Sequence, residues 1–351
     1  MIIKPIKRFY LRLFRLFLVL LIGGATISRS YAEVSASPAK RPQLDGTFIQ
    51  LLDKNSNWNT ARWEKLFDSF QAIGLRYVIV QWTLHDNMAY YATRTFEQVP
   101  RVPLEIILEL AEKRGIDLYL GLAAESQHWE MVRQSFDRQQ EYLKRLRWKS
   151  ERVAQEVAVV ATRYKAFKGW YIPEEIDDLT WRSPQLRELL FQHLKQLSGF
   201  LKKVSPDGLV LLSGFSNARM NPDSYEAFWN KLLGGTSVDV LLFQDGAGTA
   251  KLPLEILPRY LKGLRKTTDA NGKKLQVVVE LFTMVSESPF EAKPAPFCRV
   301  KQQLRIAGEY ASDGITSFSV PDYMSAEGGG AAMELLHDYQ KYTGGGLSTA
   351  P

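Results

Sequence analysis

The sequence predicts an α/β protein, a single (β/α)8 TIM barrel over residues 46–342 that follows an N-terminal signal peptide. Eight short runs of apolar and β-branched residues alternate with segments of helical periodicity. The runs recur about every 38 residues, which is enough for one helix and two loops in each repeat. Their nearly continuous apolarity indicates parallel strands that are buried on both faces by helices.

The eight strand candidates are too short to be helices. They begin at Gly46, Leu75, Ile116, Lys168, Gly208, Val238, Leu275 and Gly314. An open, doubly wound sheet is the rival arrangement, but it usually has fewer strands and often a glycine-rich phosphate turn after the first. Here the first run is followed by DKNSNWN, so we favour the closed barrel.

The intervening segments carry helix signals at both ends. Gly74 and Gly115 each follow an apolar helical pattern and favour the left-handed conformation that ends a helix. Ser183 and Asn221 each precede a proline, which pairs a capping side chain with a residue suited to the first turn. A longer, charge-rich helix is expected over residues 136–164.

Residues 1–32 have the pattern of a secretory signal peptide. Six basic and no acidic residues surround a short apolar run, and small side chains at Ser30 and Ala32 predict cleavage after Ala32. An uncleaved membrane anchor is the alternative, but the run is shorter than the roughly 20 apolar residues of a spanning helix. We therefore expect a periplasmic or secreted bacterial protein, with no stable membrane insertion after cleavage.

Removal of this segment changes the charge of the chain. The whole sequence has 45 basic and 38 acidic residues, a net charge of +7, whereas the mature chain would have 39 and 38. A charge of +1 removes the main argument for nucleic-acid binding. The single Cys298 excludes an intramolecular disulfide. Residues 33–45 are predicted to be a linker and residues 343–351 a flexible tail.

Polar residues gather where the predicted strands end. In a TIM barrel the active site lies at the carboxyl ends of the strands, so these residues should form a ring. In chain order they are Gln50, Asp53, Gln81, Trp82, His85, Asp86, Glu125, His128, Glu174, Glu175, Asp177, Asp178, Ser213, Asn217, Gln244, Asp245, Glu280, Asp322 and Tyr323.

Two glutamates in this ring suit glycoside hydrolysis. Glu175 ends the fourth strand and Glu280 ends the seventh, and these strands lie roughly across the barrel mouth from each other. One carboxylic acid can protonate the glycosidic oxygen while an ionised carboxylate attacks the anomeric carbon. The alternative is that each glutamate only pairs with an Arg or Lys in the mouth.

The same residues carry a resemblance to a known group of enzymes. The segment from Gly169 to Glu175 (GWYIPEE) resembles the fourth-strand motif of clan A glycoside hydrolases, and residues 275–282 resemble their seventh-strand motif. The resemblance implies that Glu175 is the acid/base and Glu280 the nucleophile of a retaining enzyme. The chain as a whole more closely resembles an uncharacterised bacterial family of exported, glycosidase-like TIM barrels.

One position departs from the clan A motif. Glu174 stands where the clan has an asparagine that binds the sugar 2-hydroxyl. A carboxylate can accept the same hydrogen bond, but a second carboxylate beside Glu175 leaves the acid/base assignment open between the two. Glu174 is therefore the third catalytic candidate.

Six residues are predicted to bind substrate: Gln50, Gln81, Trp82, Glu125, Gln244 and Tyr323. Amides can hold sugar hydroxyls, and aromatic faces can stack on the C–H surfaces of pyranose rings. The alternatives are that the glutamines tie loops together, that Glu125, Asp177 and Asp178 cap helices, and that Trp129, Trp181, Phe243 and Phe282 pack in the core.

No cofactor or metal is expected. His85, His128, Asp86 and Glu125 could in principle hold one ion, but no established metal-binding spacing supports this, and His193 and His337 are predicted to be ordinary helix residues. The chain also lacks a GxSxG elbow, a P-loop and a GxGxxG motif.

The sequence thus predicts an exported glycoside hydrolase whose partner is a carbohydrate substrate, such as a bacterial exopolysaccharide. A non-catalytic, periplasmic glycan-binding barrel that serves polysaccharide biosynthesis or export is the second hypothesis. In either case polysaccharide export machinery is a candidate partner.

Overall fold

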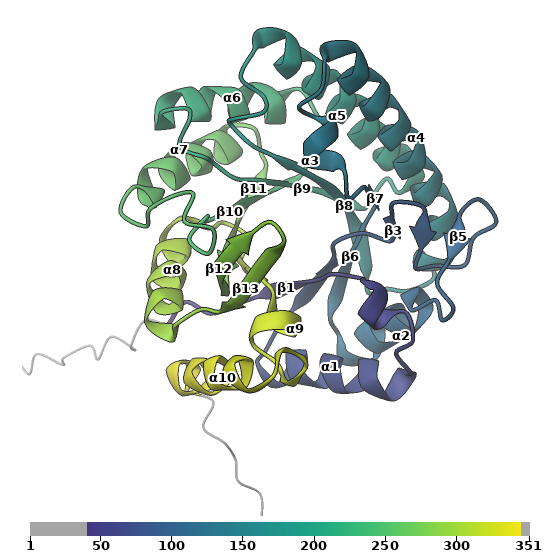
Figure 1. The fold of residues 1–351 in the computed structure, drawn as a ribbon, viewed down its shortest axis with the longest axis vertical. Helices are drawn as coiled ribbons and strands as arrows, with labels where there is room; N and C mark the ends of the chain where they lie inside the picture. The colour runs from purple at the N-terminus through teal and green to yellow at the C-terminus, as the bar shows by residue number, and fades with distance from the viewer. Residues whose placement is uncertain (1–40, 345–351) are drawn as a thin grey trace, which may run out of the picture. The chain divides into compact units, whose positions relative to one another are not determined.

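The computed structural model describes residues 41–344 and confirms the predicted barrel (Figure 1). Eight parallel strands close on themselves, each paired with its neighbour in chain order and the last with the first. They are β1 (Gly46–Ile49), β2 (Tyr77–Val80), β6 (Asp117–Gly121), β8 (Phe167–Ile176), β9 (Leu209–Gly214), β10 (Val240–Gln244), β11 (Lys274–Glu280) and β14 (Ile315–Phe318). The predicted signal peptide, residues 33–40 and residues 345–351 lie outside the described residues.

A ring of helices surrounds the strands (Figure 1). It consists of α1 (Thr60–Ala72), α2 (Leu104–Arg114), α4 (Phe136–Ala161), α5 (Pro184–Val204), α6 (Pro222–Gly234), α7 (Leu257–Ala270), α8 (Phe297–Tyr310) and α10 (Gly330–Thr343). The predicted caps are present: the side chains of Ser183 and Asn221 accept hydrogen bonds from backbone N–H groups in the first turns of α5 and α6. Gly115 ends α2 with a left-handed φ of 65°.

Two apolar layers hold the barrel together. Alternate strand residues point outward and pack against the helices, while the others fill the interior. The interior layer consists of Phe48, Tyr77, Ile79, Tyr119, Tyr171, Leu211, Val240, Leu242 and Val278. Because this layer fills the barrel, any site must lie above it, at an end of the strands.

The predicted linker needs a correction at its end. Leu44 is 2% exposed, and its backbone N–H donates to the Tyr339 hydroxyl of α10. Asp45 accepts hydrogen bonds from the Arg76 side chain and the Ile315 backbone N–H. The barrel domain therefore begins before Gly46, because these two residues fasten the chain to both neighbours of β1.

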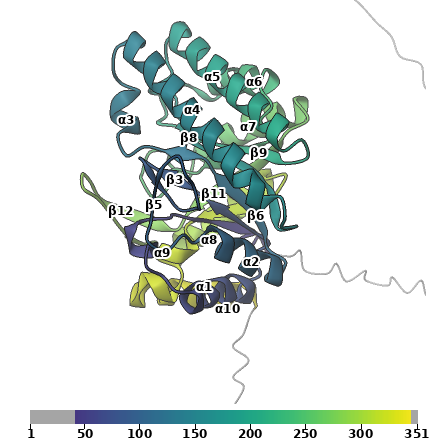
Figure 2. The same cartoon turned by 90° about the vertical axis from the view of Figure 1, so that its right-hand side faces the viewer.

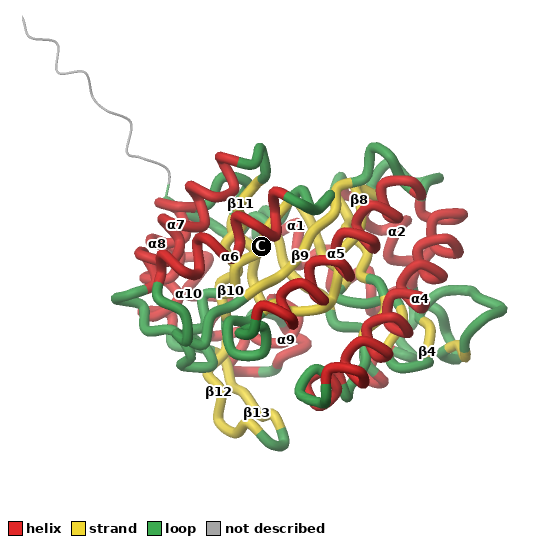
Figure 3. Tube along the Cα trace, turned by 90° about the horizontal axis from the view of Figure 1, so that it is seen from above, coloured by secondary structure: helices red, strands yellow, loops and turns green. Residues whose placement is uncertain are grey.

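Additional structure gathers at the carboxyl end of the barrel (Figures 2 and 3). A small sheet follows the second and third barrel strands, with β3 (Leu84–His85), β4 (Met88–Ala89), β5 (Glu97–Gln98) and β7 (Ala123–Ala124), and α3 (His128–Met131) comes next. A hairpin of β12 (Phe282–Glu287) and β13 (Phe290–Pro294) follows β11 and projects from the barrel, and α9 (Val320–Tyr323) follows β14.

These elements were not predicted from the sequence, because their strands are short and lack apolar alternation. Short helical turns also occur at Asp53–Asn55 (η1) and Ala326–Gly328 (η2). Within residues 41–344, none of the helices is both long enough and apolar enough to cross a membrane.

Asp178 organises the loop after β9. Its carboxylate is fully buried and accepts hydrogen bonds from the Ser216 hydroxyl and from the backbone N–H groups of Asn217, Arg219 and Met220. We expect Asp178→Ala to lower the free energy of unfolding by about 3 kcal/mol, because several buried donors would lose their acceptor. Denaturant titration measures this change.

The matched control is Asp207→Ala, since Asp207 is an exposed loop residue near the opposite end of β9. Its effect should stay within about 0.5 kcal/mol. Equal effects of the two substitutions would contradict the role assigned to Asp178.

Candidate active site

The two adjacent acidic residues at the end of β8 point to opposite sides of the strand. Tyr171 belongs to the interior layer, so Glu175, four residues later, also faces the barrel interior. Glu174 faces outward, and its Oε1 lies 2.8 Å from Nε2 of His193 on α5. The pleat of the strand therefore separates the two candidate acids.

Glu175 lies in a setting that favours its protonated form. Burial raises the pKa of Glu175, while the hydrogen bond from Gln244 Nε2 at 2.7 Å and the charge of Lys251 oppose this effect. Gln244 ends β10 on the interior face, two residues after Leu242. A raised pKa makes a carboxyl group better suited to keep a proton and donate it to a substrate.

Glu280 ends β11 on the same interior face, two residues after Val278. Its Oε2 accepts hydrogen bonds from the backbone N–H groups of Gly248, at 2.5 Å, and Thr249, at 3.1 Å. A Cβ atom on Gly248 would lie 2.8 Å from that oxygen and 2.5 Å from the Phe282 carbonyl. Only glycine therefore allows the loop to approach the carboxylate this closely.

Side chains behind Glu280 hold this loop in place. Asp245 accepts a hydrogen bond from the Ala247 N–H and another from Gln303 Nε2 of α8. Arg299, also on α8, donates to the carbonyls of Ala247 and Glu280. The outward-facing Asp245 thus connects the loop to the helix that covers β11.

Glu280 and Asp245 form a coupled acidic pair. Burial and the charge of Asp245 raise the pKa of Glu280 to about 8, and burial raises the pKa of Asp245 to about 6. Two buried carboxylates that repel each other do not both ionise readily. We therefore expect the pair to retain one proton near neutral pH.

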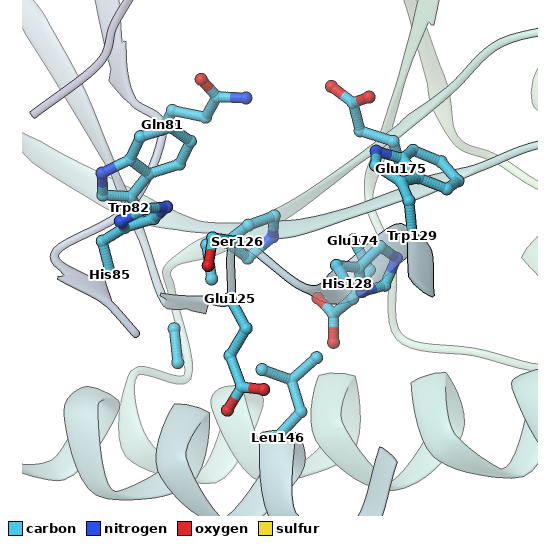
Figure 4. A pocket seen from close by; sticks show the side chains of 13 residues that line it. Gln81, Trp82, His85, Glu125, Ser126, His128, Trp129, Leu146, Glu174 and Glu175 are labelled. Carbon is cyan, nitrogen blue, oxygen red and sulfur yellow. The ribbon is translucent and has the colours of Figure 1, made fainter. Parts of the chain in front are cut away.

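A cavity of about 200 Å³ opens beside Glu175, between the loops that follow β2, β6 and β8 (Figure 4). Five of the predicted site residues line it: Gln81, Trp82, Glu125, Glu174 and Glu175. His85, Ala123, Ala124, Ser126, His128, Trp129, Leu146 and Pro173 complete the lining. Gln81 and Glu175 extend toward each other across this space.

The other predicted substrate-binding residues lie apart from the cavity lining. Gln244 contacts Glu175, as described above, and Gln50 follows β1 and is partly exposed. Tyr323 packs against Phe282, with ring centroids 5.3 Å apart, on the Glu280 side of the barrel. Gln244 thus belongs to the surroundings of Glu175, and Tyr323 lies on the side of Glu280.

Several of the predicted polar residues form ion pairs or hydrogen bonds within the protein. The Glu125 carboxylate is paired with Lys149, at 2.9 Å, and with Arg145, at 3.1 Å, both on α4. Asp177 accepts hydrogen bonds from the backbone N–H groups of Leu179 and Thr180. These carboxylates, like Asp178, thus have structural partners, but the contacts are not the helix caps considered as the alternative: Glu125 forms ion pairs, and Asp177 and Asp178 accept from turn and loop N–H groups.

Some of the aromatic candidates lie in the core, and others line the cavity. Trp181 and Phe243 are buried in the core, at 2% and 0% exposure, and Phe282 is 4% exposed. Trp82 and Trp129 line the cavity, and Trp82 stacks on His85 with ring centroids 4.7 Å apart. These two tryptophans are the aromatic side chains placed to meet a ligand there.

His193 has a partner that its place in the sequence did not indicate. It was predicted to be an ordinary helix residue, but it is 2% exposed and bonded to Glu174. Nearby, His128 Nδ1 lies 2.8 Å from the Tyr142 hydroxyl of α4, and burial lowers the pKa of His128. These contacts join residues on different elements, so no local spacing could indicate them.

The possible metal site does not form within residues 41–344. No group of three His, Cys, Asp or Glu residues there is placed to hold a metal ion. Of the four candidate ligands, His128 is bonded to Tyr142, Glu125 is paired with lysine and arginine, and Asp86 accepts from Ser126.

Fold and site together define a (β/α)8 barrel with a half-buried glutamate at the carboxyl end of its fourth strand and a buried one at that of its seventh. The chain belongs to the family described as "Domain of unknown function (DUF4434)", which matches residues 44–328. It is also 29% identical over 264 residues to the "Uncharacterized protein YbcH" of Escherichia coli (strain K12), covering 74% of this chain and 84% of that protein.

Solved structures of similar fold include two proteins with glycosidase names. A putative alpha-L-fucosidase from Bacteroides thetaiotaomicron has a TM-score of 0.73 at 20% identity, with 87% of this chain and 96% of that one covered. The endo-beta-1,4-mannanase from Thermotoga petrophila has a TM-score of 0.58 at 13% identity, with 89% and 79% covered. At these identities the likeness establishes the barrel fold.

The raised pKa of Glu280 predicts a pH dependence of stability. A carboxyl group whose folded-state pKa lies above its unfolded value contributes stability at low pH that is lost as the pH rises through the folded-state pKa. The free energy of unfolding should therefore fall between about pH 5 and about pH 8. In Glu280→Gln this fall should be smaller by at least about 1.4 kcal/mol.

Urea titrations at several pH values measure how the free energy of unfolding changes with pH in the wild-type protein and in Glu280→Gln. Glu188→Gln, an exposed substitution on α5, is the control and should retain the wild-type pH dependence. If the free energy of unfolding of Glu280→Gln changed with pH as it does in the wild type, this would contradict the raised pKa of Glu280.

Proposed function

We propose that this protein is a glycoside hydrolase that acts on an oligo- or polysaccharide through a retaining, two-carboxylate mechanism. The observation that carries the proposal is the placement of Glu175 and Glu280 on the interior face of one barrel, at the carboxyl ends of β8 and β11. The barrel likeness to proteins named as a fucosidase and a mannanase supports the same class.

In this mechanism Glu175 is the acid. Its proton passes to the glycosidic oxygen as the bond to the anomeric carbon breaks, and an ionised Glu280 oxygen forms a bond to that carbon. The leaving saccharide departs with the new hydroxyl group. Glu175, now ionised, takes a proton from water, which attacks the anomeric carbon and releases Glu280. The outward orientation of Glu174 supports Glu175 for this role.

The surroundings of Glu280 explain how it can act as the nucleophile. The nucleophile must be ionised, and the N–H groups of Gly248 and Thr249 together with the charge of Lys251 favour that form. Glu280 has the higher pKa of the two carboxyl groups, so it must lose the proton that the pair retains before it can attack the anomeric carbon. Asp245 raises this pKa by its charge and holds the loop through the hydrogen bond that it accepts from Ala247. Asp245 is thus a positioning residue that acts through Glu280 without touching the substrate.

A non-catalytic glycan-binding barrel is the second candidate. It is favoured by the cavity itself, which is lined by Glu175 but not by Glu280. In that case the hydrogen bonds to Glu280 would serve only to hold the loop after β10. The two candidates differ in whether both glutamates are needed for bond cleavage.

Export to the periplasm, a bacterial exopolysaccharide as the substrate and an association with export machinery remain part of the proposal. They rest on the signal pattern of residues 1–32.

The hydrolytic activity of variants at Glu175 and Glu280 tests the proposed enzyme. Wild-type protein should release reducing ends from at least one member of a bacterial exopolysaccharide panel. Glu175→Gln and Glu280→Gln should each lower this rate by about a thousandfold or more, because each removes a group that acts in the transition state. Glu188→Gln should keep the wild-type rate.

Binding without any release of reducing ends would instead support the glycan-binding barrel. Full activity in either glutamate variant would contradict the two-carboxylate mechanism.

A further inference from the structure

The cavity beside Glu175 contains two buried oxygen atoms without hydrogen-bond partners. Gln81 Oε1 and Glu174 Oε2 are sealed from solvent and accept no hydrogen bond within residues 41–344. Their residues are 7% and 4% exposed, and both line the cavity. Buried acceptors of this kind normally have a donor, since an unpaired buried polar group costs stability.

The remaining contacts of these two residues explain why the oxygens stay free. Glu174 uses its other oxygen, Oε1, to bind His193. Gln81 follows β2 on the interior face, above Ile79. In the described part of the chain, no donor lies within hydrogen-bond distance of its side-chain oxygen, Oε1. A ligand in the cavity would supply donors for both oxygens.

The charged residues of the cavity favour ligands without a negative charge. Glu125, Glu174 and Glu175 line it, and no lysine or arginine does so within the described residues. Lys149 and Arg145, both on α4, pair with the Glu125 carboxylate, and Lys149 also donates to the Asp86 carbonyl. A carboxylate, sulfate or phosphate on a ligand could not donate to the unpaired Oε2 of Glu174, and no lysine or arginine among the described lining residues would compensate the charge there.

The size and the aromatic lining indicate how much ligand can enter. A volume of about 200 Å³ is below the roughly 300–1,000 Å³ of sites that enclose drug-sized molecules, so the cavity suits one sugar ring rather than several. Trp82 and Trp129 provide flat apolar surfaces for the C–H face of such a ring. The polar edge of the ring would then meet Gln81 and Glu174.

We propose that this cavity is a subsite for one sugar ring that carries no negative charge and donates hydrogen bonds, from hydroxyl or ammonium groups, to Gln81 Oε1 and Glu174 Oε2. The inference deepens the proposed function by naming the substrate class, a neutral or amino-bearing saccharide rather than a uronate. It rests on that function only for the identity of the ligand as a saccharide.

Binding measurements in a Glu280→Gln background test the subsite without turnover. The probes are neutral hexasaccharides of glucose and of mannose, a hexamer of glucosamine and a hexamer of galacturonate, studied by calorimetry. At least one neutral or amino-bearing probe should bind at least tenfold more tightly than the galacturonate hexamer. Equal or tighter binding of galacturonate, or no binding by the other probes, would overturn the inference.

Two added substitutions locate the binding. Gln81→Met should weaken binding of the preferred probe at least fivefold, because it removes the acceptor but keeps the length of the side chain. Glu174→Gln should weaken binding of the glucosamine hexamer at least tenfold, and that of a neutral hexamer only a few-fold, since a hydroxyl can also accept from the new amide. The two probes thus distinguish ammonium from hydroxyl donors.

Matched controls lie on the outer face of α5. Glu188→Gln and Gln192→Met repeat comparable substitutions at exposed positions that bond only to each other and to Lys231, and should leave binding unchanged. Wild-type affinity in both cavity variants would overturn the inference, and thermal unfolding confirms that each variant is folded. If the probes bound with these preferences but the wild-type protein hydrolysed none of them, the proposed enzymatic function would be refuted and the subsite would still be supported.

Discussion

The two-residue alternation of the barrel strands decides which acidic groups face the barrel interior and which face the helices. At the end of β8 it turns Glu175 inward and Glu174 toward His193 on α5. At the end of β10 it turns Gln244 inward, where it contacts Glu175, and Asp245 toward Gln303 on α8. A shift of one residue in either strand would exchange these roles.

The outward-facing acids support the inward-facing ones. Asp245 holds the loop whose N–H groups bind Glu280, and Arg299 and Gln303 connect that loop to α8. Burial keeps these groups away from water, which raises the pKa of both carboxyl groups, and the charge of Asp245 raises the pKa of Glu280 further. The chemistry proposed for Glu280 thus depends on groups that do not face the barrel interior.

The fold could be predicted in full outline because each barrel strand has its own local signal. All eight predicted apolar runs form barrel strands, and the expected caps at Ser183 and Asn221 are present. The hairpin after β11 could not be predicted, since its exposed strands bury little apolar surface. Leu44 and Asp45 were placed in the linker because their contacts lie far away in the sequence.

The candidate site was predictable only as a ring of strand ends. Gln81, Trp82, Glu125, Glu174 and Glu175 were expected near one another, and they do line one cavity. The partners that decide their roles come from helices: His193 for Glu174, and Lys149 with Arg145 for Glu125. Helix residues of this kind have no distinguishing sequence pattern, because their function depends on a contact across two elements.

The central claim is that Glu280 forms a covalent bond to the sugar while Glu175 transfers the proton. The most direct measurement is mass spectrometry of protein that has been mixed with a 2-deoxy-2-fluoro glycoside of the preferred sugar, an analogue that slows hydrolysis of such an intermediate. The account predicts an increase in protein mass by one glycosyl unit, located by peptide mapping at Glu280. A glycosyl group on Glu175 or Glu174, or turnover that yields a product of inverted anomeric configuration, would contradict it.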